Sequence, residues 1–153
     1  MEDILRTVKI ATKAFHTADH LAYVSYPLLK DNKLLLAITQ NLYLAGVNGL
    51  DAVLHYERMY KRLNIIPIDV ESKILLFETK IESKINVPGV SKVIKDLRFI
   101  TRHHRDSKME FSRKEKFIIC SEDYSMMKTI DIEMLKTYIV VMRSFIYVLN
   151  GLK

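Results

Sequence analysis

The chain has 153 residues, of which 49% are hydrophobic and 27% charged, with four glycines, three prolines and one cysteine. This composition excludes a disordered chain, a collagen-like repeat and a disulfide-rich scaffold, and it supplies enough apolar residues for one core. The formal net charge of +6 favours anionic partners such as nucleic acid. We therefore expect a single domain over residues 1–153.

The apolar runs of the sequence are short. None reaches the roughly 18 uncharged residues that a membrane span requires, and the start Met1-Glu2-Asp3 is acidic where a signal peptide is basic. We expect a cytoplasmic protein with no membrane contact. The cysteine, Cys120, follows three apolar residues and is interpreted as a buried structural thiol.

Apolar residues at helical spacing predict two helices in the first part of the chain. The first stripe begins at Ile4 and ends near Pro27, which we expect to stop the helix. The second helix begins after the Asp31-Asn32 cap, keeps heptad spacing through Leu63 and stops before Pro67. It is the longest expected element.

Two glycines, Gly46 and Gly49, lie one turn apart within this second helix. A glycine in a helix interior costs up to about 1 kcal/mol relative to alanine, so its presence needs a reason. We expect both glycines to permit the close approach of another helix.

Two further helices are predicted before the chain becomes irregular. Asp69 caps the third, whose apolar stripe runs to Ile81. The fourth begins at about Gly89 and carries an apolar stripe that ends at Ile100. Regular spacing fails after Arg105, where a polar segment follows.

The segment before the last helix has the character of strands. Residues 117–120 and 126–130 are apolar and β-branched, and residues 121–124 suit a turn, so we predict a small hairpin. A last helix starts at the Asp131 cap and stops at Gly151. The expected fold is all-α, an up-and-down bundle of four or five helices with this β-hairpin inserted before the last.

Basic residues concentrate between Arg98 and Lys116, where seven lysines and arginines and two histidines face three acids. Cations near the end of a helix also suit its dipole, which is the plain structural explanation. On a helical wheel, Arg98 and His103 lie on opposite flanks of the apolar stripe and His104 falls nearly within it. If the helix ends at about Arg102, the following turn brings either imidazole toward the guanidinium.

The spacing Arg98-x4-His103, or Arg98-x5-His104, resembles the R-x4-6-H signature of the HEPN superfamily, the higher eukaryote and prokaryote nucleotide-binding domains. Domains of that superfamily are bundles of four or five helices, with the signature at the end of the penultimate core helix. The resemblance covers nearly the whole chain in coarse architecture. It implies an RNA- or nucleotide-binding domain, acting as a homodimer and as a metal-independent endoribonuclease without a cofactor.

The chemistry of that cleavage assigns roles to the two motif positions. Attack of an RNA 2′-OH on its own phosphate needs a base, an acid and a cation, and a two-fold axis supplies each twice. On this hypothesis His103 or His104 is the acid and base, and Arg98 holds the phosphate charge. The residues expected to hold further RNA phosphates are Arg102, Arg105, Lys108, Arg113 and Lys114.

Two alternative hypotheses stay open on the sequence. Catalytic members often carry Asn, Asp or His after the arginine, and Phe99 in that place favours a non-catalytic homodimeric module that docks on a partner such as a nucleotidyltransferase. The pairs His16-x3-His20 and Asp51-x3-His55 have the spacing of a metal site in a bundle. No Glu-x-x-His pair accompanies them, so the leading hypothesis includes no metal.

Overall fold

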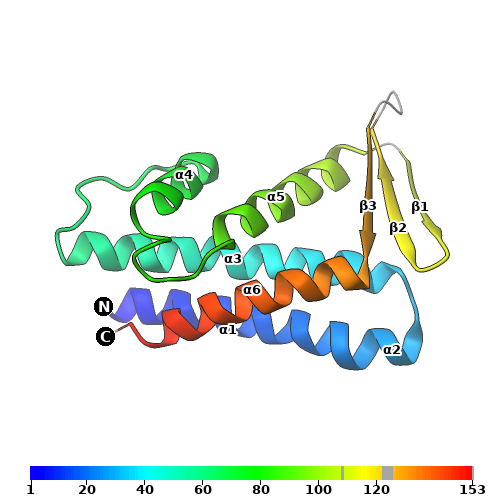
Figure 1. The fold of residues 1–153 in the computed structure, drawn as a ribbon, viewed down its shortest axis with the longest axis horizontal. Helices are drawn as coiled ribbons and strands as arrows, with labels where there is room; N and C mark the ends of the chain where they lie inside the picture. Colours follow the sequence, from blue (N-terminus) through cyan, green and yellow to red (C-terminus); the bar gives the residue numbers. More distant parts are fainter. Residues whose placement is uncertain (108, 122–125, 153) are drawn as a thin grey trace.

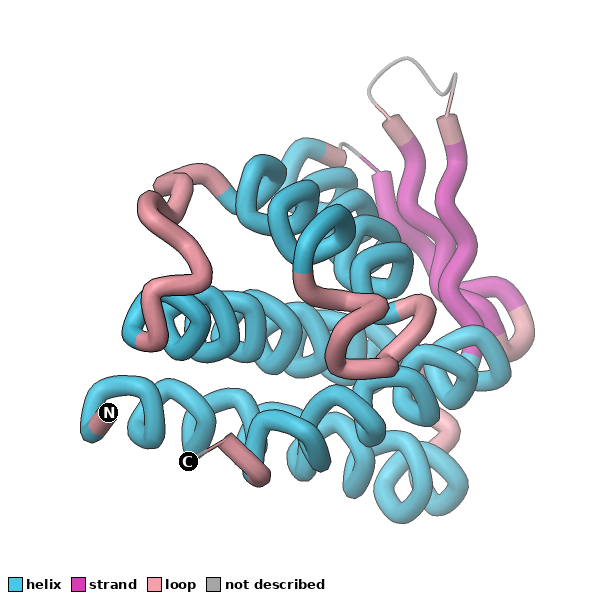
Figure 2. Tube along the Cα trace, turned by 60° about the vertical axis from the view of Figure 1, so that its left-hand side comes forward, coloured by secondary structure: helices cyan, strands magenta, loops and turns pink. Residues whose placement is uncertain are grey.

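The computed structural model describes residues 1–107, 109–121 and 126–152 (Figure 1). Three long helices, α1 (Glu2–His20), α3 (Lys33–Met59) and α6 (Ile132–Asn150), run side by side and bring the two chain ends close together (Figure 1). Two further helices, α4 (Val70–Lys80) and α5 (Val90–Asp106), pack on α3 from the other side (Figure 2). The architecture is a helical bundle around one apolar core.

None of the helices in the described residues is both long and apolar enough to cross a membrane.

The first helical segment ends at Leu29, near the predicted position, but it runs past Pro27, so the proline is not what stops it. After α1 the backbone widens into a π-helical turn (Leu21–Ser25), and α2 (Tyr26–Leu29) carries Pro27 in its first turn. A proline is tolerated in a first turn because its missing N–H has no partner there, and the wider turn upstream displaces the carbonyl that its ring would strike. Lys30 then ends the helix in a left-handed conformation, with φ 52°.

The helix caps predicted from acidic residues are confirmed at α4 and α6. The Asp69 carboxylate accepts a hydrogen bond from the Ser72 N–H (2.9 Å), and Asp131 accepts one from the Met134 N–H (2.9 Å). At the start of α3 the Asp31 carboxylate accepts from the Lys33 N–H (2.9 Å). Three aspartates therefore set where three helices begin.

Asn32 does not cap α3 with its side chain but joins the helix to the sheet. Its Nδ2 donates to the carbonyl oxygens of Lys114 (2.7 Å) and Lys116 (3.3 Å), and its Oδ1 accepts from the Tyr26 hydroxyl (3.2 Å). The side chain is buried, so each of these bonds satisfies a polar group that water cannot reach. The β1–β2 turn is thereby fixed to the corner between α2 and α3.

A three-stranded antiparallel sheet replaces the predicted two-stranded hairpin, so the fold is not strictly all-α. The strand order is β1 (Met109–Arg113), β2 (Lys116–Cys120), β3 (Met127–Asp131). The additional strand β1 lies in the segment that we interpreted as polar and irregular. In β1, Met109 and Phe111 alternate with polar residues, which is the two-residue period of a strand. This alternation is hard to recognise in the sequence because charged residues flank it on both sides.

The middle strand β2 is buried on both sides. Phe117 and Ile119 belong to the main core, while Ile118 and Cys120 point to the opposite face of the sheet and are only 6% and 3% exposed. The burial of Cys120 confirms the structural role predicted for its thiol. The predicted turn at 121–124 lies, apart from Ser121, outside the described residues.

The two glycines of α3 lie at helix contacts, as predicted. A Cβ at Gly49 would stand 2.5 Å from Phe145 Cε2 of α6, and a Cβ at Gly46 would stand 3.0 Å from Ile94 Cγ1 of α5. These contacts let α5 and α6 sit closer to α3 than any larger residue permits.

A Gly49→Ala substitution is expected to destabilise the protein by about 1–3 kcal/mol, because overpacking against the rigid Phe145 ring outweighs the gain in helix propensity. Gly46→Ala is the matched control, since Ile94 is a flexible neighbour, and its cost is expected to be smaller. Urea denaturation of both variants measures the difference. Equal stability of Gly49→Ala and the wild type would contradict the close approach of α3 and α6.

The end of α3 lies at Met59, earlier than the predicted Leu63. A buried ion-pair cluster explains the early stop: the Glu57 carboxylate lies 2.5 Å from Arg62 Nε and 2.8 Å from Lys84 Nζ. Lys61 adopts a left-handed conformation with φ 60°, which turns the chain back so that Arg62 reaches Glu57. Burial alone would raise the pKa of Glu57, but the hydrogen bonds from Arg62 and Lys84 outweigh it and hold the pKa below its ordinary value.

Glu57→Gln is expected to cost about 2 kcal/mol at neutral pH, because it leaves two cations without their shared carboxylate. Since the pKa of Glu57 is lowered by folding, its contribution is complete above the ordinary carboxyl value of about 4.3 and is lost as pH falls through the folded pKa. Urea denaturation across pH should therefore show that the free energies of unfolding of the wild type and Glu57→Gln become equal in acid. A difference that stays constant below pH 4 would refute the assignment.

Candidate functional site

Helix α5 has two chemically different faces. One face is buried in the core and carries Val93, Leu97 and Ile100. The opposite face carries charged and aromatic residues at the helical spacing i, i+4, i+7 and i+11, namely Lys95, Phe99, Arg102 and Asp106. Because apolar burial fixes the first face, the second is held outward.

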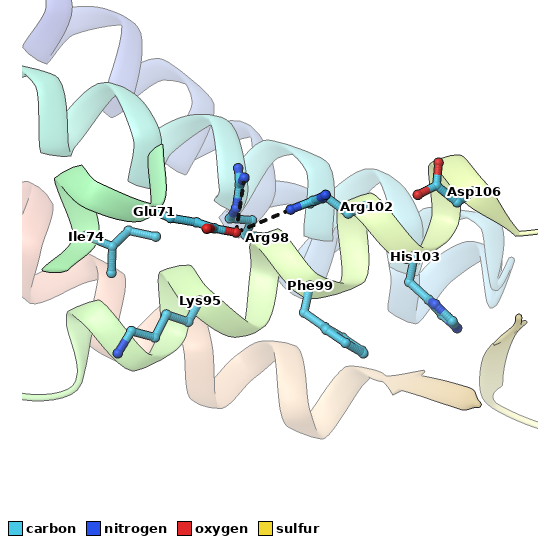
Figure 3. Close-up of a pocket in the computed structure, with 8 residues that line it drawn as sticks. All are labelled: Glu71, Ile74, Lys95, Arg98, Phe99, Arg102, His103 and Asp106. Atoms are coloured by element: carbon cyan, nitrogen blue, oxygen red, sulfur yellow. Dashed lines mark hydrogen bonds and ion pairs between the residues drawn. The ribbon is translucent and has the colours of Figure 1, made fainter. Parts of the chain in front are cut away.

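A pocket of about 490 Å³ lies along this outer face, where α4 packs beside α5 (Figure 3). Helix α4 contributes two of its lining residues and α5 contributes the rest. Both candidate catalytic positions, Arg98 and His103, line it. The full set is Glu71, Ile74, Lys95, Arg98, Phe99, Arg102, His103 and Asp106.

The Arg98 guanidinium reaches two different elements. Its Nη1 donates to the Tyr43 hydroxyl of α3 (3.2 Å), and its Nη2 lies 3.6 Å from a carboxylate oxygen of Glu71. The same Glu71 oxygen accepts a hydrogen bond from Arg102 Nη1 (3.3 Å), so one carboxylate bridges two guanidinium groups (Figure 3). This side of the pocket is built to hold negative charge.

The other side of the pocket is aromatic. The rings of Phe99 and His103 stack with their centroids 5.6 Å apart and their planes 14° from parallel. Both rings project from the side of α5 opposite to the Arg98 and Arg102 side chains (Figure 3). The Lys128 ammonium of β3 lies 5.9 Å from the centre of the Phe99 ring, which adds a cation to the aromatic side.

Two buried nitrogens in this pocket have no hydrogen-bond partner, and they belong to the two motif residues. They are Arg98 Nε and His103 Nε2, and among the described residues they are the buried side-chain polar atoms left unsatisfied. An unpaired buried polar group costs about 1–3 kcal/mol, so such atoms are rare unless a ligand completes them. Each of the two motif residues therefore keeps one hydrogen-bonding nitrogen unused in this structure.

The helix does not end at Arg102, so a turn that brings Arg98 and His103 together is not formed. Helix α5 continues to Asp106 and holds the two residues on the flanks of its outer face, as the helical wheel indicates for a continuing helix. Across the described residues no hydrogen bond or ion pair joins Arg98 to His103. They share a pocket without forming a pair.

His104 has a structural environment. Its Nδ1 is in hydrogen-bond contact with a carboxylate oxygen of Glu110 in β1, and both side chains are less than one-third exposed. His104 does not line the pocket. The contact ties the end of α5 to the edge strand, which separates this histidine from its neighbour His103.

Of the residues predicted to hold RNA phosphates, Arg102 alone lines the pocket within the described part of the chain. Arg105 is exposed beside it and lies 3.4 Å from a carboxylate oxygen of Asp106. Arg113 and Lys114 lie at the β1–β2 turn, at the far end of the sheet from α5 (Figure 1). Lys108 lies outside the described residues.

The pocket also contains residues that the sequence reading missed. Lys95 belongs to the same face of α5 as Arg102. Its position opposite the apolar stripe of the helix is the sequence signal that could have identified it. Glu71 and Ile74 come from α4, and no sequence pattern indicates which helix packs beside α5. The acidic partner of the two arginines was therefore not predictable.

The predicted metal pairs are engaged in other contacts. The Asp51 carboxylate binds Lys73 Nζ (2.7 Å), and His55 Nδ1 lies 2.7 Å from the Asp51 carbonyl oxygen. His16 and His20 line a shallow groove along α1. Across residues 1–107, 109–121 and 126–152 no group of three or more His, Cys, Asp or Glu side chains is placed to hold a metal ion.

Comparison of the chain with protein-family models, with curated proteins and with solved structures found no match in any of the three.

The different environments of the two histidines lead to a stability test. His104→Ala is expected to cost about 1–2 kcal/mol, because it leaves the half-buried Glu110 carboxylate unpaired. His103→Ala, which removes a side chain without a hydrogen bond at Nε2, is expected to change stability by no more than about 0.5 kcal/mol. Urea denaturation measures both. The reverse ranking would assign the structural role to His103.

Proposed function

We propose that the α5 pocket binds RNA or a nucleotide. The observation that carries this proposal is the pair of buried, unpartnered nitrogens, Arg98 Nε and His103 Nε2, in one pocket. A ligand whose acceptor oxygens reach these atoms after a shift of the two side chains recovers the energy lost there. The two arginines on one side of the pocket suit the phosphate of a nucleotide, and the aromatic pair on the other side suits its base.

Each part of the pocket has a role in this proposal. Arg98 and Arg102 present planar guanidinium groups, which bind phosphate oxygens through paired hydrogen bonds. Phe99 is 43% exposed and offers a ring face on which a base can stack, a contact worth about 1–3 kcal/mol per base. The net positive charge of the chain favours the approach of such a ligand.

We further propose, on the resemblance to the HEPN superfamily, that a homodimer cleaves RNA without metal at this pocket. The 2′-OH attacks the adjacent phosphorus, the bond to the 5′ oxygen breaks, and the products are a 2′,3′-cyclic phosphate and a free 5′-OH. His103 takes the hydroxyl proton or supplies one to the leaving oxygen, and Arg98 stabilises the phosphorane charge. One chain holds a single Arg98 and a single His103 on separate flanks, so a second chain is needed to complete the set.

The test uses single-stranded RNA in the presence of EDTA, with binding and cleavage measured on the same samples. Arg98→Ala is expected to weaken binding by about 5- to 30-fold, the loss of a charge-assisted hydrogen bond. His103→Ala is expected to weaken binding less than Arg98→Ala does, because it removes no charge-assisted contact to phosphate, and to lower cleavage by about 10²-fold or more, as removal of an acid or base does. Arg6→Ala is the matched control, since it removes an exposed arginine of α1 that does not line the pocket, and it should behave as the wild type.

The outcomes separate the two parts of the proposal. Binding that depends on Arg98, without cleavage by any variant, would leave an RNA-binding pocket and remove the nuclease. No binding by the wild type would refute the whole proposal. Cleavage that EDTA abolishes would point to a metal-dependent reaction instead.

A non-catalytic interaction module is the second candidate function. It is favoured by the apolar outer face of the sheet, where Met109, Phe111 and Met127 are each at least 39% exposed. An exposed apolar surface of this kind is typical of a protein-docking site. Absence of RNA binding by the wild type would favour this candidate.

A further inference from the structure

Glu71 occupies an unusual position in the pocket. Its carboxylate oxygen Oε1 lies 3.3 Å from Arg102 Nη1 and 3.6 Å from Arg98 Nη2, between the two groups best suited to hold a phosphate (Figure 3). A carboxylate and a phosphate present oxygens of similar charge to a guanidinium. Glu71 therefore stands where an anionic ligand group would bind.

This contact contributes little to holding the fold. The Glu71 side chain is 68% exposed and that of Arg102 is 50% exposed, so water screens this pair and it is worth little. Arg98 is 22% exposed, but its Nη2 lies 3.6 Å from Glu71, and it keeps its hydrogen bond to Tyr43 when Glu71 leaves. Helix α4 is held instead by its buried residues Ile74 and Phe77 and by the ion pair between Lys73 and Asp51. Glu71 can leave the arginines without loss of α4.

The remaining charges around the two arginines are also acidic on the α4 side. The Asp69 carboxylate caps α4 and lies close enough to Arg98 for that guanidinium to lower its pKa, after the larger effect of the Ser72 hydrogen bonds. Because Asp69 is engaged with Ser72, it is not free to replace Glu71. Glu71 is then the carboxylate that an incoming anion has to displace.

We propose that Glu71 is an internal competitor for the phosphate position of the pocket: its carboxylate fills that position when no ligand is present, and the phosphate of an incoming ligand has to displace it. This inference rests on the proposed nucleotide or RNA binding. It assigns the phosphate to Arg98 and Arg102 and the base to the stacked Phe99 and His103. An uncharged nucleoside gains nothing from the arginines, so the pocket favours phosphate-bearing ligands.

The experiment compares the wild type with Glu71→Gln, an exposed and nearly isosteric change. Calorimetric titration uses AMP and adenosine as probes, and a short single-stranded RNA is titrated in parallel. AMP and RNA are expected to bind Glu71→Gln about 2- to 5-fold more tightly, the range that corresponds to an exposed ion pair. The affinity for adenosine should not change, because adenosine has no phosphate to compete with Glu71.

Glu133→Gln serves as the matched control, because it removes the same charge from α6 at a residue that does not line the pocket. It should bind AMP and RNA as the wild type does. An equal gain in AMP affinity in both variants would show that the effect comes from net charge alone and would overturn the inference. Tighter binding of adenosine by Glu71→Gln would overturn it as well.

Failure of this inference is distinguishable from failure of the proposed function. Wild-type binding of AMP or RNA with no gain in Glu71→Gln would overturn the role of Glu71 and leave the binding function intact. No binding of either probe by either protein would overturn both.

Discussion

The packing of α3 against the other long helices is the constraint on which the rest of the structure depends. Helices α1, α4, α5 and α6 all contact α3, and no other element touches so many. At Gly46 and Gly49 its backbone contacts the side chains of Ile94 in α5 and Phe145 in α6 directly. Because α5 is seated this closely, the direction of its outer face is fixed, and with it the positions of Arg98 and His103.

The pocket follows from the same constraint through α4. Lys73 of α4 binds Asp51 of α3, and this ion pair fixes the height of α4 along the central helix. The Glu57 cluster holds the chain between α3 and α4 and limits the path by which α4 returns to the bundle. The Lys73–Asp51 pair and the Glu57 cluster, together with the buried residues of α4, therefore place Glu71 beside the arginines of α5.

Much of the helical framework was predictable because it depends on local signals. Apolar periodicity and aspartate caps located α4, α5 and α6, and the partial burial of His104 agrees with its wheel position near the core stripe. The errors arose where distant contacts override local rules. A π-helical turn accommodates Pro27, an ion pair with Arg62 shortens α3, and pairing with β2 draws Met109–Arg113 into a strand. The site was half predicted for the same reason: the residues on α5 share a periodic face, whereas Glu71 joins them only through the tertiary packing of α4.

The burial of Cys120 gives the protein a built-in reporter of its own local opening. The thiol is the one cysteine of the chain, and it lies in the middle strand of the sheet, flanked by Met109 of β1 and Met127 of β3. A thiol reagent can reach it only when the groups that cover it move aside, so its labelling rate measures how often this face of the sheet opens. Because Lys128 of the neighbouring strand β3 extends over Phe99, an opening that displaces β3 also removes this cation from the aromatic side of the pocket.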